Sequence, residues 1–172
     1  RREKWKSSLI SLKNIKLIKR LNNMKLLSQR DPFYASRKIG DSKLTIGRFG
    51  CCLTSISMIS DYFGCYVSPL QLASDVNHFT PDGLVLWKNF EFPKMRFVWR
   101  DYIRNDVKIR QALRDPNKAV MLRVNKGQHW VVGLKPTLFG NDYLIADPWS
   151  GKKCYAIKTY FDIDGAAYWE RV

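Results

Sequence analysis

The residue types best suited to chemistry in this chain are a cysteine, a histidine and an aspartate, namely Cys51, His129 and Asp147. Cys51 follows Gly50 at the start of a predicted helix, and the free N–H groups of a helix N-terminus favour the thiolate form of a cysteine. A histidine can form that nucleophile by taking the proton, and an aspartate can hold the histidine in the required orientation. If the three side chains meet, the pattern predicts a cysteine hydrolase of amide bonds.

Two adjacent cysteines compete for the role of nucleophile. At about 100° per residue along a helix over 51–63, Cys52 falls toward the apolar face that carries Leu53 and Ile56, and Cys51 falls on the opposite face. We therefore expect Cys52 to pack as a small hydrophobic side chain and Cys51 to face a cleft. The alternative is that both are buried structural cysteines.

The histidine and the aspartate each belong to a predicted strand. His129 begins the segment HWVVGLK, and Asp147 ends the segment YLIAD. A hairpin centred near residue 138 sets His129 opposite Asp147 and Gly133 opposite Tyr143. Directly opposed residues share one face of a sheet with side chains about 5 Å apart, so the carboxylate could hold one imidazole nitrogen and leave the other for the thiol. A partly exposed histidine at a strand end is the alternative.

Gln29 is the candidate for stabilising a developing negative charge. An acyl-transfer reaction needs hydrogen-bond donors where the oxyanion forms, and a side-chain amide together with the backbone N–H of Cys51 would supply two. Taken alone, Gln29 is an ordinary polar residue of a turn-rich loop over 28–50.

The order of these residues resembles that of the bacteriocin-processing, double-glycine type of cysteine peptidase, whose members share the papain-like fold. The resemblance covers the chain from Ser28 to its end. Its matching segments are SQRDP, KIGDSKLTIGRFGC, CLTSISM, SPLQL, DGLVLW, HWVV and DPWSG, in that order. One position departs from the pattern, because Cys52 stands where relatives commonly have Gly or Ala.

The resemblance implies a papain-like α+β fold, with N-terminal helices packed on a C-terminal antiparallel sheet. It also implies four roles: Cys51 as the nucleophile, His129 as general base and then acid, Asp147 as the residue that orients the histidine, and Gln29 in the oxyanion hole. The residue patterns point the same way, since helices over 51–63, 69–76 and 107–114 precede strands over 119–124, 130–134, 143–146, 155–157 and 167–172. We expect these elements to form two layers.

Charge divides the chain into two parts. The whole chain of 172 residues has a net charge of +15, and residues 1–27 contribute +8 from nine Lys and Arg and one Glu. We predict a basic helical arm over 1–27 that tethers the peptidase domain over 28–172 to a larger protein, because the chain begins with Arg rather than Met. No transmembrane segment is expected, and no aromatic–basic module indicates a nucleic-acid partner.

The expected substrate is a peptide. Because basic charge would concentrate the domain on anionic wall polymers, we predict hydrolysis of the peptide part of peptidoglycan by a module of a cell-envelope or phage-particle protein. The open alternatives are a protease that processes a protein precursor and a non-catalytic papain-like binding module. Trp87 and Trp130 are the expected substrate contacts. The four cysteines lack metal-binding spacing, so neither a metal nor a cofactor is expected.

Overall fold

The computed structural model describes residues 15, 17–18, 22–138 and 140–172. The predicted helix of the basic arm lies largely outside these residues. Within the described part of the chain, no helix combines the length and the hydropathy needed to cross a bilayer.

The fold is α+β, as the sequence predicted, and its centre is one six-stranded antiparallel sheet in the order β1-β6-β2-β3-β4-β5. The strands are β1 (Arg96–Asp101), β2 (Lys118–Val124), β3 (His129–Pro136), β4 (Tyr143–Asp147), β5 (Lys152–Tyr155) and β6 (Gly165–Glu170). The described α-helices are α2 (Ile46–Phe49), α3 (Cys51–Phe63), α4 (Pro69–Ser74), α5 (Asp106–Leu113) and α6 (Ala156–Tyr160), with short 3₁₀ turns η1 (Val76–His78) and η2 (Trp87–Asn89).

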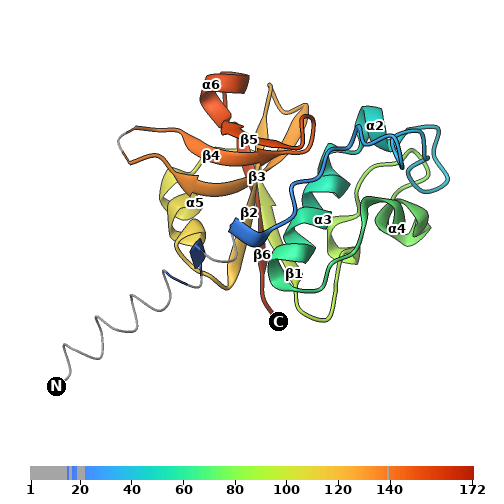
Figure 1. Ribbon diagram of the computed structural model, residues 1–172, viewed down its shortest axis with the longest axis horizontal. Helices are drawn as coiled ribbons and strands as arrows, with labels where there is room; N and C mark the ends of the chain where they lie inside the picture. The colour runs from blue at the N-terminus through green and yellow to red at the C-terminus, as the bar shows by residue number, and fades with distance from the viewer. Residues whose placement is uncertain (1–14, 16, 19–21, 139) are drawn as a thin grey trace.

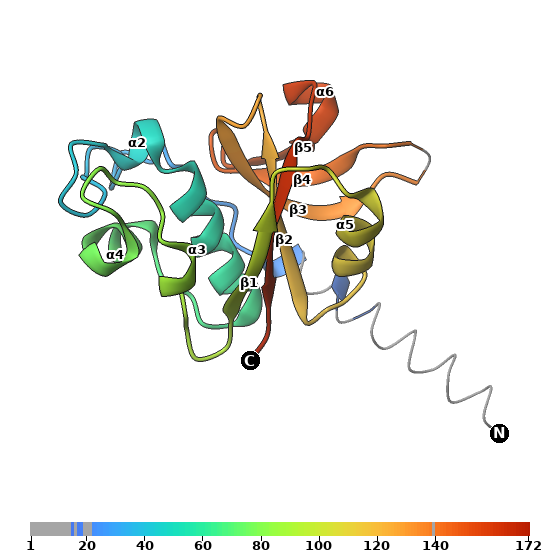
Figure 2. The same cartoon turned by 180° about the vertical axis from the view of Figure 1, so that it is seen from behind.

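Helices cover both faces of this sheet, so the prediction of two layers was wrong. On one face, α2, α3 and α4 form a helical layer, and the opposite face carries α5 (Figures 1 and 2). Successive residues of β2 divide between two hydrophobic clusters, with Met121 packed on the α3 side and Val120 on the α5 side. A strand buried on both faces has a continuous apolar run in place of the polar alternation of a half-exposed strand, and the run over 119–122 in β2 is of this kind.

Local signals define the ends of the helices that precede the sheet. Gly64, at φ 75°, ends α3 in the left-handed conformation that glycine adopts without strain. Ser68 and Gln71 form a reciprocal capping box at the start of α4. The cap of α5 is Asn105, whose side chain accepts a hydrogen bond from the N–H of Lys108.

The predicted strand over 155–157 is wrong, because a helix begins at Ala156. Its first N–H groups are capped from a distance: the carboxylate of Asp142 accepts hydrogen bonds from Ile157 at 2.8 Å and from Lys158 at 3.2 Å. A carboxylate at a helix N-terminus satisfies donors that would otherwise lack partners. Since that cap lies more than a dozen residues upstream, the local pattern could not reveal it.

The predicted register of β3 with β4 is also wrong. Gly133 pairs with Ile145 rather than with Tyr143, and Tyr143 pairs with Pro136 beyond a bulge at Leu134. The extra residue of the bulge and an off-centre turn shift the pairing by about two residues. Because side chains in a strand alternate with a period of two, a shift by two keeps the side chains of His129 and Asp147 on a common face.

Candidate active site

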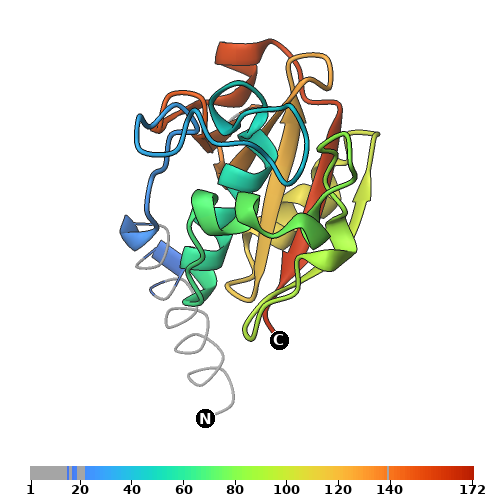
Figure 3. The ribbon, with the colours of Figure 1, turned by 90° about the vertical axis from the view of Figure 1, so that its right-hand side faces the viewer.

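The candidate site lies where the first turn of α3 meets the ends of β3 and β4. Helix α3 packs against the sheet alongside the strands (Figure 3), and the Ser55 hydroxyl donates a hydrogen bond to the carbonyl of Trp130 at 3.2 Å. This contact joins the helix that begins with Cys51 to the strand that begins with His129. The two residues therefore occupy the ends of two elements that are fixed to one another.

Gly50 determines how the chain enters α3. A Cβ atom at this position would lie 2.5 Å from the carbonyl oxygen of Ile46 and 2.7 Å from its side chain. The N–H of Gly50 also donates to that carbonyl at 2.7 Å, so the end of α2 and the start of α3 are in direct contact. Only a residue without a side chain allows this approach, and Cys51 is positioned by it.

The two cysteines differ in their surroundings as the helical pattern predicted. Cys52 is buried, and its burial raises the pKa of the Cys52 thiol well above the ordinary value. Cys51 is half-buried and lines a cavity together with His129. The thiolate is the reactive form, so the environment of Cys52 opposes reactivity at that sulfur.

His129 and Asp147 form a buried hydrogen-bonded pair. The imidazole Nε2 lies 2.9 Å from Oδ1 of Asp147, and both side chains are nearly excluded from solvent. An ionised carboxylate can only accept, so Nε2 carries the proton and Nδ1 is left for the thiol of Cys51. Burial alone lowers the pKa of His129, but the hydrogen bonds and charges of Asp147 and Cys51 outweigh burial and raise the pKa to about 9.

Asp147 is held as a carboxylate by several donors besides the histidine. Its oxygens accept hydrogen bonds from the N–H of Trp149 at 3.0 Å and from the hydroxyl of Ser150 at 3.0 Å. Burial alone would raise the pKa of Asp147, but the hydrogen bonds from His129, from the Trp149 N–H and from the Tyr160 hydroxyl together lower it. The carboxylate therefore stays charged at neutral pH and fixes the orientation of the imidazole.

Gln29 lies in the wall of the same cavity. Its backbone N–H donates to the carbonyl of Pro148 at 2.7 Å, which ties the N-terminal loop to the segment after β4. Its side-chain Nε2 donates to the carbonyl of Gly47 at 3.2 Å, whereas its Oε1 is buried with no hydrogen-bond partner among the described residues. The amide nitrogen carries two hydrogens, of which the bond to Gly47 takes one and a longer contact of 3.5 Å with the carbonyl of Ile46 takes the other.

Two cavities meet at Cys51. The first, of about 410 Å³, brings together Gln29, Cys51 and His129, with Asp147 lying behind the histidine. The second, of about 520 Å³, is lined in part by the predicted substrate contacts Trp87 and Trp130. Phe49, Cys51 and Gln128 line both cavities, so the two form one cleft with the half-buried thiol at the junction.

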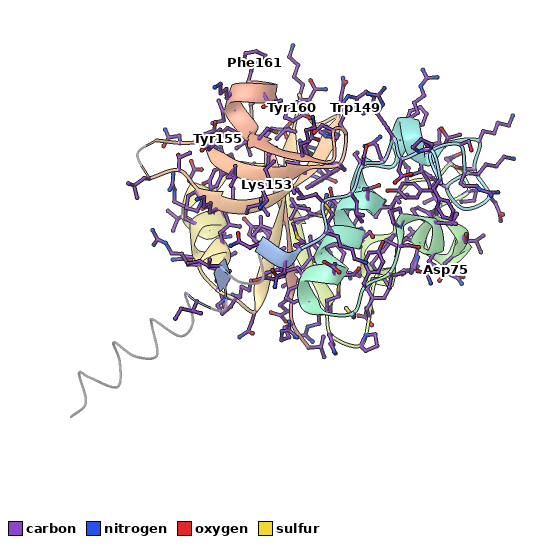
Figure 4. The ribbon with its side chains drawn as sticks, viewed as in Figure 1. Asp75, Trp149, Lys153, Tyr155, Tyr160 and Phe161 are labelled. Atoms are coloured by element: carbon purple, nitrogen blue, oxygen red, sulfur yellow. The ribbon has the colours of Figure 1, made fainter. Side chains whose placement is uncertain are left out.

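Tyr160, Asn125 and Gln128 are among the cleft residues that were not predicted from the sequence. Tyr160 of α6 places its ring 5.2 Å from the imidazole of His129, and Figure 4 shows Tyr160 and Trp149 near one another at the top of the molecule. Asn125 and Gln128 line the cavity from the β2–β3 turn. Asn125 has φ 54°, a left-handed conformation that asparagine tolerates better than most residues, and the turn-forming Asn125 and Gly127 between two strands were the signal available in the sequence.

The arrangement can activate a thiol without a metal ion, because its base, orienting carboxylate and donors are all side-chain or backbone groups. Among the described residues, no three His, Cys, Asp or Glu side chains gather closely enough to hold a metal ion. The four cysteines, Cys51, Cys52, Cys65 and Cys154, are all free thiols.

Comparison with known proteins gives no relative: no family model, no curated protein and no solved structure matches this chain. The chemistry of the cleft therefore has to be argued from its residues.

Proposed function

We propose that the protein is a cysteine peptidase with a papain-like arrangement, which hydrolyses amide bonds through a thioester intermediate. The observation that carries the proposal is the convergence of Cys51, His129 and Gln29 on one cavity, with Asp147 hydrogen-bonded to the histidine at 2.9 Å. A half-buried cysteine at a helix start, next to a histidine oriented by a carboxylate, has the geometry of an activated nucleophile.

The proposed reaction has two halves. In the first, the Cys51 thiolate attacks the carbonyl carbon, and the carbonyl electron pair moves onto oxygen. The carbonyl then re-forms as the C–N bond breaks, and His129 gives its proton to the departing amine, which leaves a thioester on Cys51. In the second half, water attacks the thioester while His129 takes its proton. The C–S bond breaks, the acid is released, and the thiolate–imidazolium pair is restored.

Two groups are candidates for stabilising the oxyanion. The backbone N–H of Cys51 lies in the first turn of α3, where backbone N–H groups have no partner inside the helix. The Gln29 amide is the other donor, because Gln29 lines the cavity with Cys51, and its long contact of 3.5 Å with the Ile46 carbonyl is the weaker of its two hydrogen bonds and the one an oxyanion would replace. Loss of one oxyanion donor typically lowers the rate by about 10²–10³-fold.

The proposed substrate is the peptide part of peptidoglycan, with protein-precursor processing as the rival enzymatic function. The net charge of +15 supports an anionic target, because basic charge concentrates a protein on anionic polymers. Turbidity clearing of purified cell walls over a range of salt concentrations checks this choice. Wall suspensions that stay turbid under all salt conditions, while a protein precursor is cleaved, would reverse it.

The aromatic residues of the cleft support a second candidate, a papain-like module that binds peptide or glycan without turnover. Trp149 lines the first cavity, Trp87 and Trp130 line the second, and Phe49 lies at their junction. Aromatic rings that line a cleft can bind a ligand whether or not a reaction follows. The cysteine variants distinguish the two candidates.

The test compares Cys51→Ala with Cys52→Ala. We expect Cys51→Ala to abolish both peptide hydrolysis and rapid labelling by iodoacetamide, because it removes the nucleophile. Cys52→Ala should keep both, at a cost of about 1–2 kcal/mol in stability from the emptied space. Labelling sites are read by mass spectrometry. Loss of hydrolysis only in Cys52→Ala would refute the assignment, and full labelling of Cys51 without hydrolysis of any peptide or wall substrate would favour the binding module.

A further inference from the structure

The second cavity of the cleft has a charge that the proposed reaction does not use. Arg100 and Arg123 both line it, beside Trp87, Trp130 and Cys51. Arg123 is neutralised by Asp164, with two hydrogen bonds of 2.7 and 3.0 Å. No aspartate or glutamate of the described residues lines this cavity.

Arg100 is the cation of this cavity whose charge is not matched by an anion. Its guanidinium lies 5.0 Å from the ring centroid of Trp87 and 5.3 Å from that of Tyr102, so two aromatic side chains hold it in place. Among the described residues, no carboxylate forms an ion pair with it. A guanidinium placed over aromatic rings keeps N–H donors for other partners, and these donors can bind a carboxylate with two hydrogen bonds.

The position of His129 assigns this cavity to one side of the scissile bond. The histidine must protonate the departing amine, so the amine side of the substrate lies next to the imidazole. His129 lines the first cavity but not the second, whereas Cys51 lines both. The second cavity therefore holds the acyl part of the substrate, which stays bound to Cys51 as the thioester.

We propose that the cavity formed by Arg100, Trp87 and Trp130 is a subsite for an acidic side chain on the acyl side of the cleaved bond. The inference rests on the proposed function, because it uses Cys51 and His129 to orient the substrate. It adds a substrate class to that function, namely peptides that carry Asp or Glu shortly before the scissile bond. The aromatic rings bind the methylene groups of such a side chain, and Arg100 binds its carboxylate.

The experiment uses acyl-side probes that react with the thiol. Acetyl-trialanine vinyl sulfones are prepared with a single Glu or Gln at the first, second or third position from the reactive group. The thiolate adds to the vinyl carbon, and the resulting carbanion takes a proton from the imidazolium, so no leaving group is needed. The rate of Cys51 modification is followed by intact-protein mass spectrometry, with iodoacetamide as a reference reagent that does not occupy the cavity.

We expect Glu to accelerate labelling over Gln by about tenfold at one of the three positions, because a charged hydrogen-bonded pair contributes roughly that factor. Arg100→Gln should remove the preference while it leaves the iodoacetamide and Gln-probe rates within about twofold. Arg100→Lys, which keeps the charge, should retain part of it. Arg96→Gln is the matched control, because Arg96 belongs to the same strand and pairs with Glu170 away from the cavity.

The outcomes separate this subsite from the proposed function. Equal Glu and Gln rates at all three positions, or a preference that survives Arg100→Gln, would overturn the subsite while rapid iodoacetamide labelling of Cys51 left the peptidase proposal standing. If neither iodoacetamide nor any vinyl sulfone modified Cys51, the activated thiol would be refuted, and the subsite with it.

Discussion

Asp147 sets the pH at which His129 gives up its proton. In the proposed reaction, the raised pKa of His129, about 9, keeps the imidazolium available to the leaving amine through neutral pH, so kcat/KM should fall on the alkaline side near pH 9. Asp147→Asn removes the charge that supports the imidazolium. Because a charged hydrogen bond contributes about 1.5–3 kcal/mol, the alkaline limb should move down by about 1–2 pH units. The measurement is the pH profile of kcat/KM.

A second histidine–aspartate pair provides the control for this prediction. Asp75 lies 3.6 Å from Nε2 of His78, in a part of the molecule far from the labelled Tyr160 and Trp149 (Figure 4). Asp75→Asn should leave the profile unchanged. An alkaline limb that stays near pH 9 in Asp147→Asn would mean that another group loses the proton.

At the scale of single residues, the sequence predicted the candidates that belong to rare and chemically distinctive residue types. Cys51 and His129 are rare residues in strong local contexts, a helix start and a strand start, so their roles could be proposed without coordinates. Tyr160 could not be found this way, because its contacts with His129 and Asp147 depend on α6, whose first two residues the sequence pattern had assigned to a strand over 155–157. Tyrosines are common, and only their place in the fold distinguishes them.

The contact between α2 and α3 provides a prediction at the scale of elements. Gly50→Ala would place a Cβ atom 2.5 Å from the carbonyl oxygen of Ile46, so the helix start must shift. We expect a loss of about 2–4 kcal/mol in the free energy of unfolding, measured with urea. Activity should fall by about 10²-fold in the fraction that remains folded, because a displacement near 1 Å at a reacting group has that effect.

Gly64→Ala is the matched control at the other end of the same helix. A Cβ atom there meets nothing within 4 Å, but φ 75° strains an alanine. It should cost about 1–2 kcal/mol and leave kcat/KM unchanged. If the two variants lost equal activity, a disturbance at either end of α3 would impair the site, and the close approach at Gly50 would have no special role.

Elements with local signals were predictable, and elements fixed by distant contacts were not. Helix α3 has a glycine on each side, and α4 has a proline and a capping box, so sequence patterns located both. Strand β1 is an edge strand with alternating exposed and half-buried residues, and it gains its partners only from β6 at the end of the chain. The β3–β4 register depends on a bulge at Leu134, and the isolated Gly133 beside it was a local signal that the hairpin prediction did not use.

At the scale of the whole molecule, the sheet separates two hydrophobic clusters that should contribute differently to function. The cluster on the α3 side includes Ile56 and joins the helix of Cys51 to the sheet, whereas the cluster on the α5 side includes Ile109. Both isoleucines are completely buried. Replacement of either by alanine should cost about 2–5 kcal/mol, from lost burial and the cavity left behind.

The two variants should nevertheless differ in activity. Ile56→Ala loosens the contact that sets Cys51 against His129, so kcat/KM should fall by about tenfold or more at 25 °C in urea-free buffer. Ile109→Ala acts on the face away from α3, and kcat/KM should stay within about twofold. If either variant is unfolded at 25 °C, the corresponding valine variants allow the same comparison with a smaller cavity. Equal kcat/KM in the two variants would show that the α3–sheet contact stabilises the fold without tuning the cleft.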